Sequence, residues 1–391
     1  MKKLLIISLL LILLAGCVFH DIPPTEPQTE AVPPTLSPTA PPTDPPTEPP
    51  TEVPTDPIAE MVENMTVEEK VGQLFLCRYD RGNAAAHVQQ YHLGGWILFG
   101  GDFDGQTPET IRAEIAALQT LSPIPLLMAV DEEGGTVTRV SRYPAFRDSK
   151  FSSPRKLYGS GGEELLLSTE AEKSQLLTSI GLNVNVGPVC DITTDKNAFM
   201  YSRSLGQDPE TTGQLIAGMV QTMSEHHVGS VLKHFPGYGN NADTHVGIAR
   251  DNRTLEALEA VDLVPFRAGI DAGADCILVS HTIVEALDAD LPASLSPTVI
   301  GYLRSEMGFN GVVLTDDLVM QAITDTYGAG EAAVMAVLAG NDLLCASEYV
   351  TQYEAVLAAV NDGRIPMERI DEAVYRVLRW KQELGLLKFD S

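Results

Sequence analysis

Short apolar runs alternate with longer segments of helical periodicity from about residue 58 to the end of the chain. The apolar runs end in polar residues, which is typical of strands buried in a parallel sheet. The predicted strands lie near residues 73–77, 95–99, 126–131, 182–191, 230–234, 275–281, 311–316 and 342–346. Amphipathic helices are predicted at 107–121, 163–180, 209–226, 255–272, 297–307 and 330–339, with a last one at 367–387.

This serial repetition of strand and helix predicts an α/β fold, a single (β/α)8 barrel of the TIM type. The alternative is a doubly wound open sheet. No glycine-rich phosphate-binding loop follows any of the predicted strands, which favours the barrel. In a barrel, the polar residues at the carboxyl ends of the strands meet on one face, where the active site is expected.

The first residues have a different pattern. Residues 1–16 contain two lysines followed by an apolar run that is short for a transmembrane helix, so they are predicted to be a signal peptide. The sequence L-A-G-C, from Leu14 to Cys17, resembles a bacterial lipobox, and this implies cleavage before Cys17 and lipidation of that residue. The alternative is an ordinary signal peptide that happens to end near a cysteine.

Residues 17–57 are predicted to be a linker, and residues 58–391 the catalytic domain. The linker consists mainly of repeats such as P-P-T-D-P-P-T-E-P, which cannot bury a core and favour extended polyproline II. With a lipidated Cys17, it would be a stalk that holds the domain at the outer face of the cytoplasmic membrane.

The charge narrows the range of partners. A formal net charge of -27 argues against binding to nucleic acid or to an anionic membrane surface, because both need a basic face. We therefore expect contact with the membrane through the lipid anchor only. The cysteines after Cys17 are Cys77, Cys190, Cys276 and Cys345, which lie far apart beside apolar residues and lack metal-type spacing, so we expect buried thiols. We expect no cofactor, no metal and a monomer.

The stretch K-H-F-P-G-Y-G-N-N-A-D-T-H, from Lys233 to His245, is the strongest candidate for chemistry. It follows a predicted strand and contains too much Gly, Pro and Asn to continue as strand or helix, so it is a predicted loop. Asp243 and His245 are two residues apart, so in an extended segment the carboxylate could orient the imidazole and stabilise its cationic form. An isolated D-x-H is more often a simple turn.

This stretch resembles the K-H-F-P-G-H-G-x(4)-D-S-H pattern of the family-3 β-N-acetylglucosaminidases, in the NagZ-like branch. The resemblance implies that His245 is the general acid/base and Asp243 its partner, and that Lys233 and His234 bind the sugar. Two positions differ from the pattern: Tyr238 replaces a His, and Thr244 replaces a Ser.

Other strand ends strengthen the resemblance. The barrel would bring Asp131, Asp191, Lys233, His234, His281 and Asp316 to one face, with Arg139 and Arg203 on the loops behind. Alternation cannot choose between Asp316 and Asp317 in G-V-V-L-T-D-D-L, but the family resemblance implies that the first Asp is the nucleophile. It also implies that Asp131 and Arg139, from A-V-D-E-E-G-G-T-V-T-R, and Arg203, from R-S-L-G-Q-D-P, bind the sugar. Glu132 and Thr136 stand where the family usually has Gln and Arg.

The implied reaction is the retaining hydrolysis of a terminal β-N-acetylglucosaminide from cell-wall or chitin-type glycans, through a covalent glycosyl-Asp316 intermediate. Surface anchoring and the resemblance favour cell-wall fragments. One alternative is phosphorolysis, because a histidine, unlike a carboxylate, does not repel an incoming phosphate. A metal-dependent hydrolase is another, although H-x-H and H-E-x-x-H spacings are absent. A sugar-binding lipoprotein without turnover is the alternative outside the enzymes.

Overall fold

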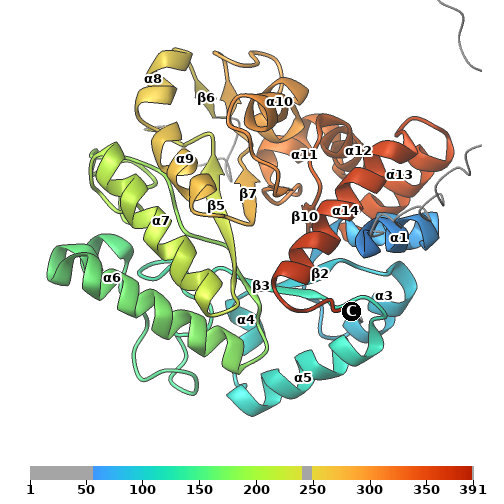
Figure 1. Cartoon of the computed structure of the whole chain (residues 1–391), viewed down its shortest axis with the longest axis horizontal. Coiled ribbons are helices and arrows are strands. Elements are labelled where there is room, and N and C mark those ends of the chain that lie inside the picture. The colour runs from blue at the N-terminus through green and yellow to red at the C-terminus, as the bar shows by residue number, and fades with distance from the viewer. Residues whose placement is uncertain (1–55, 240–248, 390–391) are drawn as a thin grey trace, which may run out of the picture. The chain divides into compact units, whose positions relative to one another are not determined.

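Parallel strands in a closed ring form the centre of the structure (Figure 1). The computed structural model describes residues 56–239 and 249–389, which belong to one compact unit. Within these residues an eight-stranded parallel sheet has the order β10-β1-β2-β3-β4-β5-β7-β9. Its strands are β1 (Phe75–Arg78), β2 (Gly95–Leu98), β3 (Leu127–Val130), β4 (Val184–Asn185), β5 (Gly229–Phe235), β7 (Cys276–Val279), β9 (Val312–Thr315) and β10 (Leu344–Ala346).

The two end strands of this order also meet. Leu314 and Leu343 form a parallel bridge, and the backbone N–H of Thr315 donates to the carbonyl of Leu343 at 3.1 Å. This pairing closes the sheet into a barrel, so the predicted (β/α)8 fold is confirmed. A separate two-stranded pair, β6 (Arg250–Asp251) with β8 (Ile283–Val284), was not predicted.

Side chains alternate between the inside of the barrel and the surrounding helices. Leu127, Ala129, Val231 and Leu314 belong to one buried cluster that fills the barrel interior, together with side chains of β1, β2, β4, β7 and β10. The intervening residues, such as Met128, pack outward against helices. Because both faces of the strands are covered, the strands are apolar throughout rather than alternating with polar residues.

The helices surround the strands, and several begin with the expected capping chemistry. Asp208 caps α7 by accepting a hydrogen bond from the backbone N–H of Thr211 at 2.8 Å, and a proline follows at the first helical position. The helices are α1 (Pro57–Asn64), α2 (Val67–Gln73), α3 (Ala84–Tyr91), α4 (Gly100–Phe103), α5 (Pro108–Leu121), α6 (Pro154–Ser179), α7 (Pro209–Glu225), α8 (Leu255–Ala260), α9 (Leu263–Asp271), α10 (Pro297–Ser305), α11 (Gln321–Tyr327), α12 (Ala329–Ala339), α13 (Tyr349–Asn361) and α14 (Met367–Glu383), with a 3-10 turn, η2 (Ala293–Leu295).

Most differences from the predicted helices have local causes. The region 163–180 belongs to the longer α6, which is interrupted by non-helical backbone at Gly161 and Gly162. The region 255–272 is divided into α8 and α9, because the helical hydrogen bonding is interrupted at Val261 and Asp262. The helices α1, α2, α3, α4, α11 and α13 were not predicted. No helix in the described part of the chain is both long and apolar enough to span a bilayer.

Helix α14 covers the amino-terminal end of the barrel. Val377, Trp380 and Leu384 join the cluster that fills the barrel interior.

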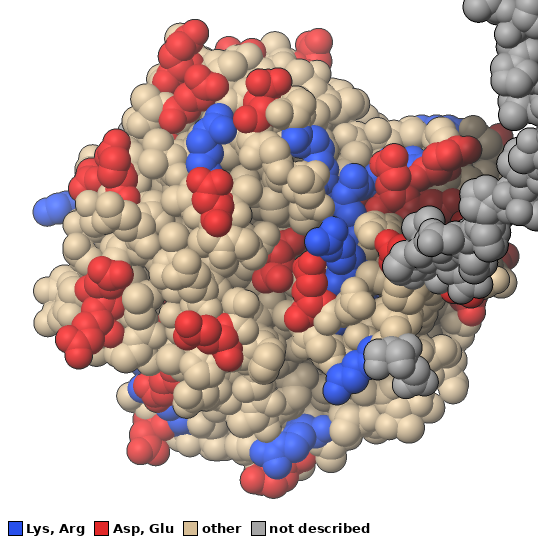
Figure 2. All heavy atoms as spheres, in the orientation of Figure 1, with Lys and Arg blue, Asp and Glu red and all other residues tan. Residues whose placement is uncertain are grey.

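Cys77, Cys190, Cys276 and Cys345 are buried free thiols, which confirms the expectation from sequence. In the view of Figure 1, acidic side chains are spread over the surface, while several Lys and Arg side chains gather near its centre (Figure 2). Because α14 covers the amino-terminal end of the barrel, the active face is expected at the carboxyl end, where the strands finish.

Candidate active site

A cavity of about 960 Å³ lies where the carboxyl ends of the strands meet. Its lining includes the side chains that follow β3, β5 and β9, and this is the face on which barrel folds hold their chemistry. Six of the residues predicted from the sequence line it: Asp131, Arg139, Arg203, Lys233, His234 and Asp316. The structure therefore brings these residues together.

Four charged side chains on one side of the cavity form a continuous network. The Lys233 ammonium lies 2.7 Å from Asp131 Oδ1 and 2.7 Å from Glu133 Oε1. Arg203 grips Glu133 with two nitrogens, Nη2 to Oε1 at 2.6 Å and Nε to Oε2 at 2.9 Å. The side chain of Asp131 is 16% exposed and that of Glu133 is 2% exposed. Glu133 is thus the buried anchor, and Asp131 is the carboxylate that faces the cavity.

The network keeps its members charged despite their burial. Burial acts to raise the pKa of Glu133, but Lys233 and Arg203 outweigh it and hold that pKa well below its usual range. Burial acts to lower the pKa of Lys233, and the two carboxylates Asp131 and Glu133 raise it above its ordinary value. A rigid set of charges at this position suits the recognition of several hydroxyl groups, because each charged group can form strong hydrogen bonds.

The His234 ring lies between the carboxylate of Asp191 and the guanidinium of Arg203. Its Nδ1 lies 2.7 Å from Asp191 Oδ2, and its Nε2 lies 3.1 Å from Arg203 Nη2. Because arginine can only donate, Nε2 of His234 is the acceptor and the proton is on Nδ1, where it is donated to Asp191. Asp191 also accepts from the backbone N–H of Tyr238 at 2.7 Å. Asp191 was expected on the active face, but it is 1% exposed and lies beneath His234.

Asp316 enters the cavity because of its place in the strand alternation. Leu314 points into the barrel, so Asp316, two residues further, points the same way. The Asp316 backbone N–H donates to the Val279 carbonyl at 3.0 Å, and its Oδ1 accepts from the backbone N–H of Asp317 at 2.9 Å. The neighbouring Asp317 also lines the cavity, and its carboxylate accepts from the backbone N–H groups of Val319 and Ser347.

The ionisation of Asp317 differs from that of an exposed carboxylate. Burial is the main cause that raises its pKa, and the charge of Asp316 adds to the effect, against the hydrogen bonds from Ser347.

His281 was expected on the active face, but it does not line the cavity formed by the described residues. Val279 points outward from the barrel, so His281, two residues further along the chain, also lies outside the cavity lining. Its ring contacts Ser294 Oγ at 2.7 Å and the Asp317 carbonyl at 3.0 Å, and it is fully buried. The prediction treated every polar residue after a strand as equivalent and missed this alternation.

The loop after β3 is shaped by Glu132. This buried carboxylate accepts at Oε2 from the backbone N–H groups of Arg139 and Val140, both at 2.7 Å, and at Oε1 from the Ser141 hydroxyl. These bonds fix Arg139 at the cavity. The buried Nε of Arg139 has no hydrogen-bond partner among the described residues, and its guanidinium lies over the Phe99 ring at 5.6 Å. An unsatisfied donor at the edge of a cavity is well suited to bind a polar ligand.

Three predicted residues cannot be placed. Asp243, His245 and Cys17 lie outside the described residues, so the predicted dyad and the lipidation site stay predictions. Glu133 is a charged residue of the described cavity lining that the sequence reasoning did not assign, although it follows directly in V-D-E-E-G-G. Among residues 56–239 and 249–389, no three His, Cys, Asp or Glu side chains are grouped so that they could hold a metal ion.

Sequence comparison finds relatives across most of the described unit. The glycosyl hydrolase family 3 N-terminal domain matches residues 66–380. Beta-hexosaminidase LpqI from Mycobacterium tuberculosis is 32% identical over 329 residues, which cover 81% of this chain and 83% of that protein. A beta-hexosaminidase from Stenotrophomonas maltophilia is 35% identical over 278 residues, which cover 68% of this chain and 80% of that protein.

Structure comparison finds the same group. A glycoside hydrolase family 3 beta-N-acetylglucosaminidase from Paenibacillus superposes with a TM-score of 0.78 and 33% identity, over 84% of this chain and 64% of that one. This chain thus spans less than two thirds of the Paenibacillus protein. LpqI from M. tuberculosis superposes with a TM-score of 0.76 and 28% identity, over 83% of this chain and 96% of that one.

Proposed function

Because the chain belongs to glycosyl hydrolase family 3, we propose that it removes terminal, non-reducing β-N-acetylglucosamine residues from cell-wall or chitin-type glycans. It is a glycosidase that retains the anomeric configuration. The similar proteins that are named beta-hexosaminidases and a beta-N-acetylglucosaminidase support this substrate class.

The observation that carries the proposal is the position of Asp316 relative to the charged network. In the closed strand order, β9 lies four strands from β3 in either direction, so Asp316 and Asp131 face each other across the mouth of the barrel. A sugar held through its hydroxyl groups by Asp131, Arg203 and Lys233 would therefore extend its anomeric carbon toward Asp316. This arrangement fits a nucleophile that attacks a ring whose other end is fixed.

The reaction then proceeds in two displacements. An Asp316 carboxylate oxygen forms a bond to the anomeric carbon as the bond to the leaving oxygen breaks, and His245 gives its proton to that oxygen. In the second step, His245 takes a proton from water, the water oxygen bonds to the anomeric carbon, and the bond to Asp316 breaks. Asp243 orients His245 and stabilises its cationic form. The roles of Asp243 and His245 rest on the sequence resemblance.

A panel of 4-nitrophenyl glycosides tests the proposed substrate. We expect 4-nitrophenyl β-N-acetylglucosaminide to be turned over far better than the β-glucoside or the α-anomer. The released sugar should be free N-acetylglucosamine in phosphate buffer as well as in phosphate-free buffer. N-acetylglucosamine-1-phosphate as the main product would instead identify a phosphorylase, and binding without turnover would identify a sugar-binding protein.

A fluorinated N-acetylglucosamine inactivator tests the nucleophile. The trapped sugar should be found on Asp316 by mass spectrometry of proteolytic peptides, because fluorine slows both displacements while the reactive leaving group of the inactivator restores the rate of the first. A label on Asp317 or Asp131 would contradict the assignment.

We infer that the enzyme acts as a monomer at the cell surface, anchored through a lipidated Cys17. The apolar run and the L-A-G-C sequence support the anchor. Globomycin should cause the uncleaved precursor to accumulate, and a Cys17→Ser variant should lose acyl label and membrane association. Light scattering should give the mass of a single chain; a dimer mass, or a membrane-bound Cys17→Ser variant, would contradict this inference.

A further inference from the structure

The predicted loop that carries His245 has two stems in the described part of the chain. The first stem, residues 236–239, follows β5, and the second stem, residues 249–251, contains β6 (Figure 1). In the sequence, His245 is six residues from Gly239 and six from Asp251. Because six residues span at most about 20 Å, the positions of the two stems limit where the His245 side chain can act.

Arg253, two residues after the second stem, binds two buried carboxylates. Its Nη2 lies 2.6 Å from Asp251 Oδ2, and its Nε lies 3.0 Å from each oxygen of the same carboxylate. Its Nη1 lies 2.6 Å from Oδ2 of Asp262, which directly precedes α9. The side chains of Asp251 and Asp262 are 2% and 1% exposed. Arg253 therefore joins the second stem to the layer of helices outside the barrel.

The first stem packs directly on this ion cluster. Gly239 has a φ of +54°, and a Cβ at this position would lie 2.6 Å from Arg253 Nη2. Gly237 has a φ of +117°, and a Cβ there would lie 2.7 Å from Asp262 Oδ1. Glycine is needed at both positions, because no side chain fits between this backbone and the charged groups. The same guanidinium thus lies against one stem and is bonded to the other.

The first stem is also tied to the sugar-binding side of the cavity. Asp191 accepts from the Tyr238 backbone N–H at Oδ1 and from His234 Nδ1 at Oδ2, both at 2.7 Å. His234 and Tyr238 line the cavity. Asp191 therefore fixes the first stem relative to the bound sugar, and Arg253 fixes the second stem relative to the first.

We propose that Arg253 is a positioning residue: it holds the two stems together and thereby places His245 for proton transfer to the leaving oxygen. This inference rests on the function proposed above, with His245 as the acid. Without the guanidinium, the buried carboxylates of Asp251 and Asp262 would lose their shared cation, and the stems would no longer be joined.

The proposal separates proton transfer from nucleophilic attack. Asp316 is positioned by its own backbone N–H, which donates to the Val279 carbonyl at 3.0 Å, and by the Asp317 N–H, which lies 2.9 Å from Asp316 Oδ1. The sugar would be held by the charged network that follows β3 and β5. Loss of Arg253 should therefore weaken donation of the proton and leave attack on the anomeric carbon largely intact.

Two substrates with different leaving groups test this separation. N,N′-diacetylchitobiose releases a sugar hydroxyl and depends on the acid, whereas 4-nitrophenolate leaves with little help from a proton. Arg253→Ala should lower kcat/KM for the disaccharide by about 30-fold or more, and for 4-nitrophenyl β-N-acetylglucosaminide by less than about threefold. His245→Ala should give the same pattern with a larger gap. A general loss of structure would lower both values equally, so equal losses in Arg253→Ala would overturn the proposal.

Two further variants control for charge and for folding. Arg250→Ala removes a cation from the same strand, but its side chain is 54% exposed and lies 3.6 Å from Glu285, so the ratio of the two kcat/KM values should not change. An equal shift of this ratio in Arg250→Ala and Arg253→Ala would contradict the assignment. If Arg253→Ala does not fold, Arg253→Lys replaces it: the ammonium cannot reproduce the two-carboxylate geometry, and an unchanged ratio would then refute the proposal.

The contact between Arg253 and the first stem can be tested by a double substitution. Gly239→Ala places a methyl group against the guanidinium and should shift the kcat/KM ratio in the same direction as Arg253→Ala. In the Arg253→Ala background, the same substitution should shift the ratio by less than half as much, because the contact is already lost. Independent, multiplicative effects would show that the two residues do not act through this contact and would refute the proposed role.

These assays distinguish failure of this inference from failure of the proposed function. Absence of wild-type turnover with 4-nitrophenyl β-N-acetylglucosaminide would refute the function. An active wild type with equal losses for both substrates in His245→Ala would refute the assigned acid, and the role of Arg253 with it. The expected pattern in His245→Ala, together with equal losses in Arg253→Ala, would refute only the positioning role.

Discussion

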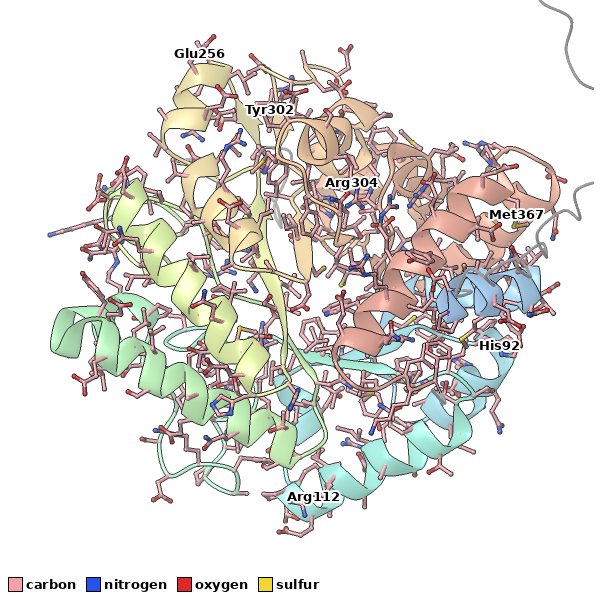
Figure 3. All side chains as sticks on the ribbon, viewed as in Figure 1. His92, Arg112, Glu256, Tyr302, Arg304 and Met367 are labelled. Carbon is pink, nitrogen blue, oxygen red and sulfur yellow. The ribbon has the colours of Figure 1, made fainter. Side chains whose placement is uncertain are left out.

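The two ends of the barrel both contain buried charges, but they arrange them differently. At the carboxyl end of the strands, Asp131 and Asp316 are only partly buried and face a cavity. At the amino end, Asp342 is fully buried and lies against three arginines. Arg369 Nη2 and Arg376 Nη1 lie 2.6 Å and 3.1 Å from its Oδ1, and Arg304, labelled in Figure 3, contacts its Oδ2.

The amino end also contains an isolated cation. Lys381 on α14 is fully buried, and its ammonium donates to Gln73 Oε1 at 2.7 Å. Burial alone lowers its pKa to about 7. Charges that face a cavity remain available to a ligand, whereas charges enclosed by the fold can act only on its stability. The ends of the barrel therefore separate function from stability.

The largest expected effect is a loss of turnover when the aspartate at the functional end of the barrel is replaced by asparagine. Asp316→Asn keeps the shape of the side chain and removes the nucleophile, so turnover of 4-nitrophenyl β-N-acetylglucosaminide should fall by about 10⁴-fold or more. Urea unfolding should change by less than about 1 kcal/mol, because the side chain is only partly buried and Asn keeps its shape. A variant that keeps more than about a tenth of wild-type turnover would remove Asp316 from the mechanism.

The opposite result is expected at the amino end. Asp342→Asn leaves Arg304, Arg369 and Arg376 without their shared anion, and should lower the free energy of unfolding by about 3–5 kcal/mol. The folded fraction should retain its kcat. Glu383→Gln is the control, since it removes an exposed ion pair with Arg379 on α14 and should change stability by less than about 1 kcal/mol. A loss for Asp342→Asn no larger than for Glu383→Gln would contradict the stabilising role of the cluster.

A smaller effect, this time a gain in the free energy of unfolding, is expected when Lys381 is replaced. Its pKa is lower in the folded chain than the ordinary 10.5, so the unfolded chain binds more protons between about pH 7 and 10.5, and wild-type stability gains from rising pH in that window. Lys381→Met should therefore stabilise the protein by roughly 2–4 kcal/mol below pH 7. This advantage should shrink toward pH 10.5. Urea unfolding of both proteins across this range measures the difference, and an advantage independent of pH would contradict it.

The strands could be predicted because burial on both faces leaves a direct mark on the sequence. Each of the eight predicted strand regions overlaps an observed strand. Helices such as α13 were missed because their apolar positions were not separated from the neighbouring loops by clear start signals. The break of α6 at Gly161 and Gly162 depends on backbone conformation that two glycines permit but do not require.

The site was predictable only in part, because pairings across the chain leave no local pattern. Polar residues after strands identified Asp131, Lys233 and Asp316, but the same rule also included Asp191 and His281, which do not line the cavity formed by the described residues. Strand alternation separates Asp316 from His281 once the inward residues of each strand are known. The role of Glu133 depends on Arg203, which is 70 residues away in the sequence, so no spacing could indicate it.

The thiols described in the fold have a consequence for how the domain can be handled. Cys77, Cys190, Cys276 and Cys345 are free and buried, and burial raises the pKa of each one, so thiolate, the form that oxidants and alkylating reagents attack, is scarce. None of these four cysteines forms a disulfide, so the native state does not need their oxidation for its stability. The catalytic domain should therefore fold equally well in a reducing cytoplasm and in an oxidising exterior, and should tolerate dithiothreitol without loss of activity.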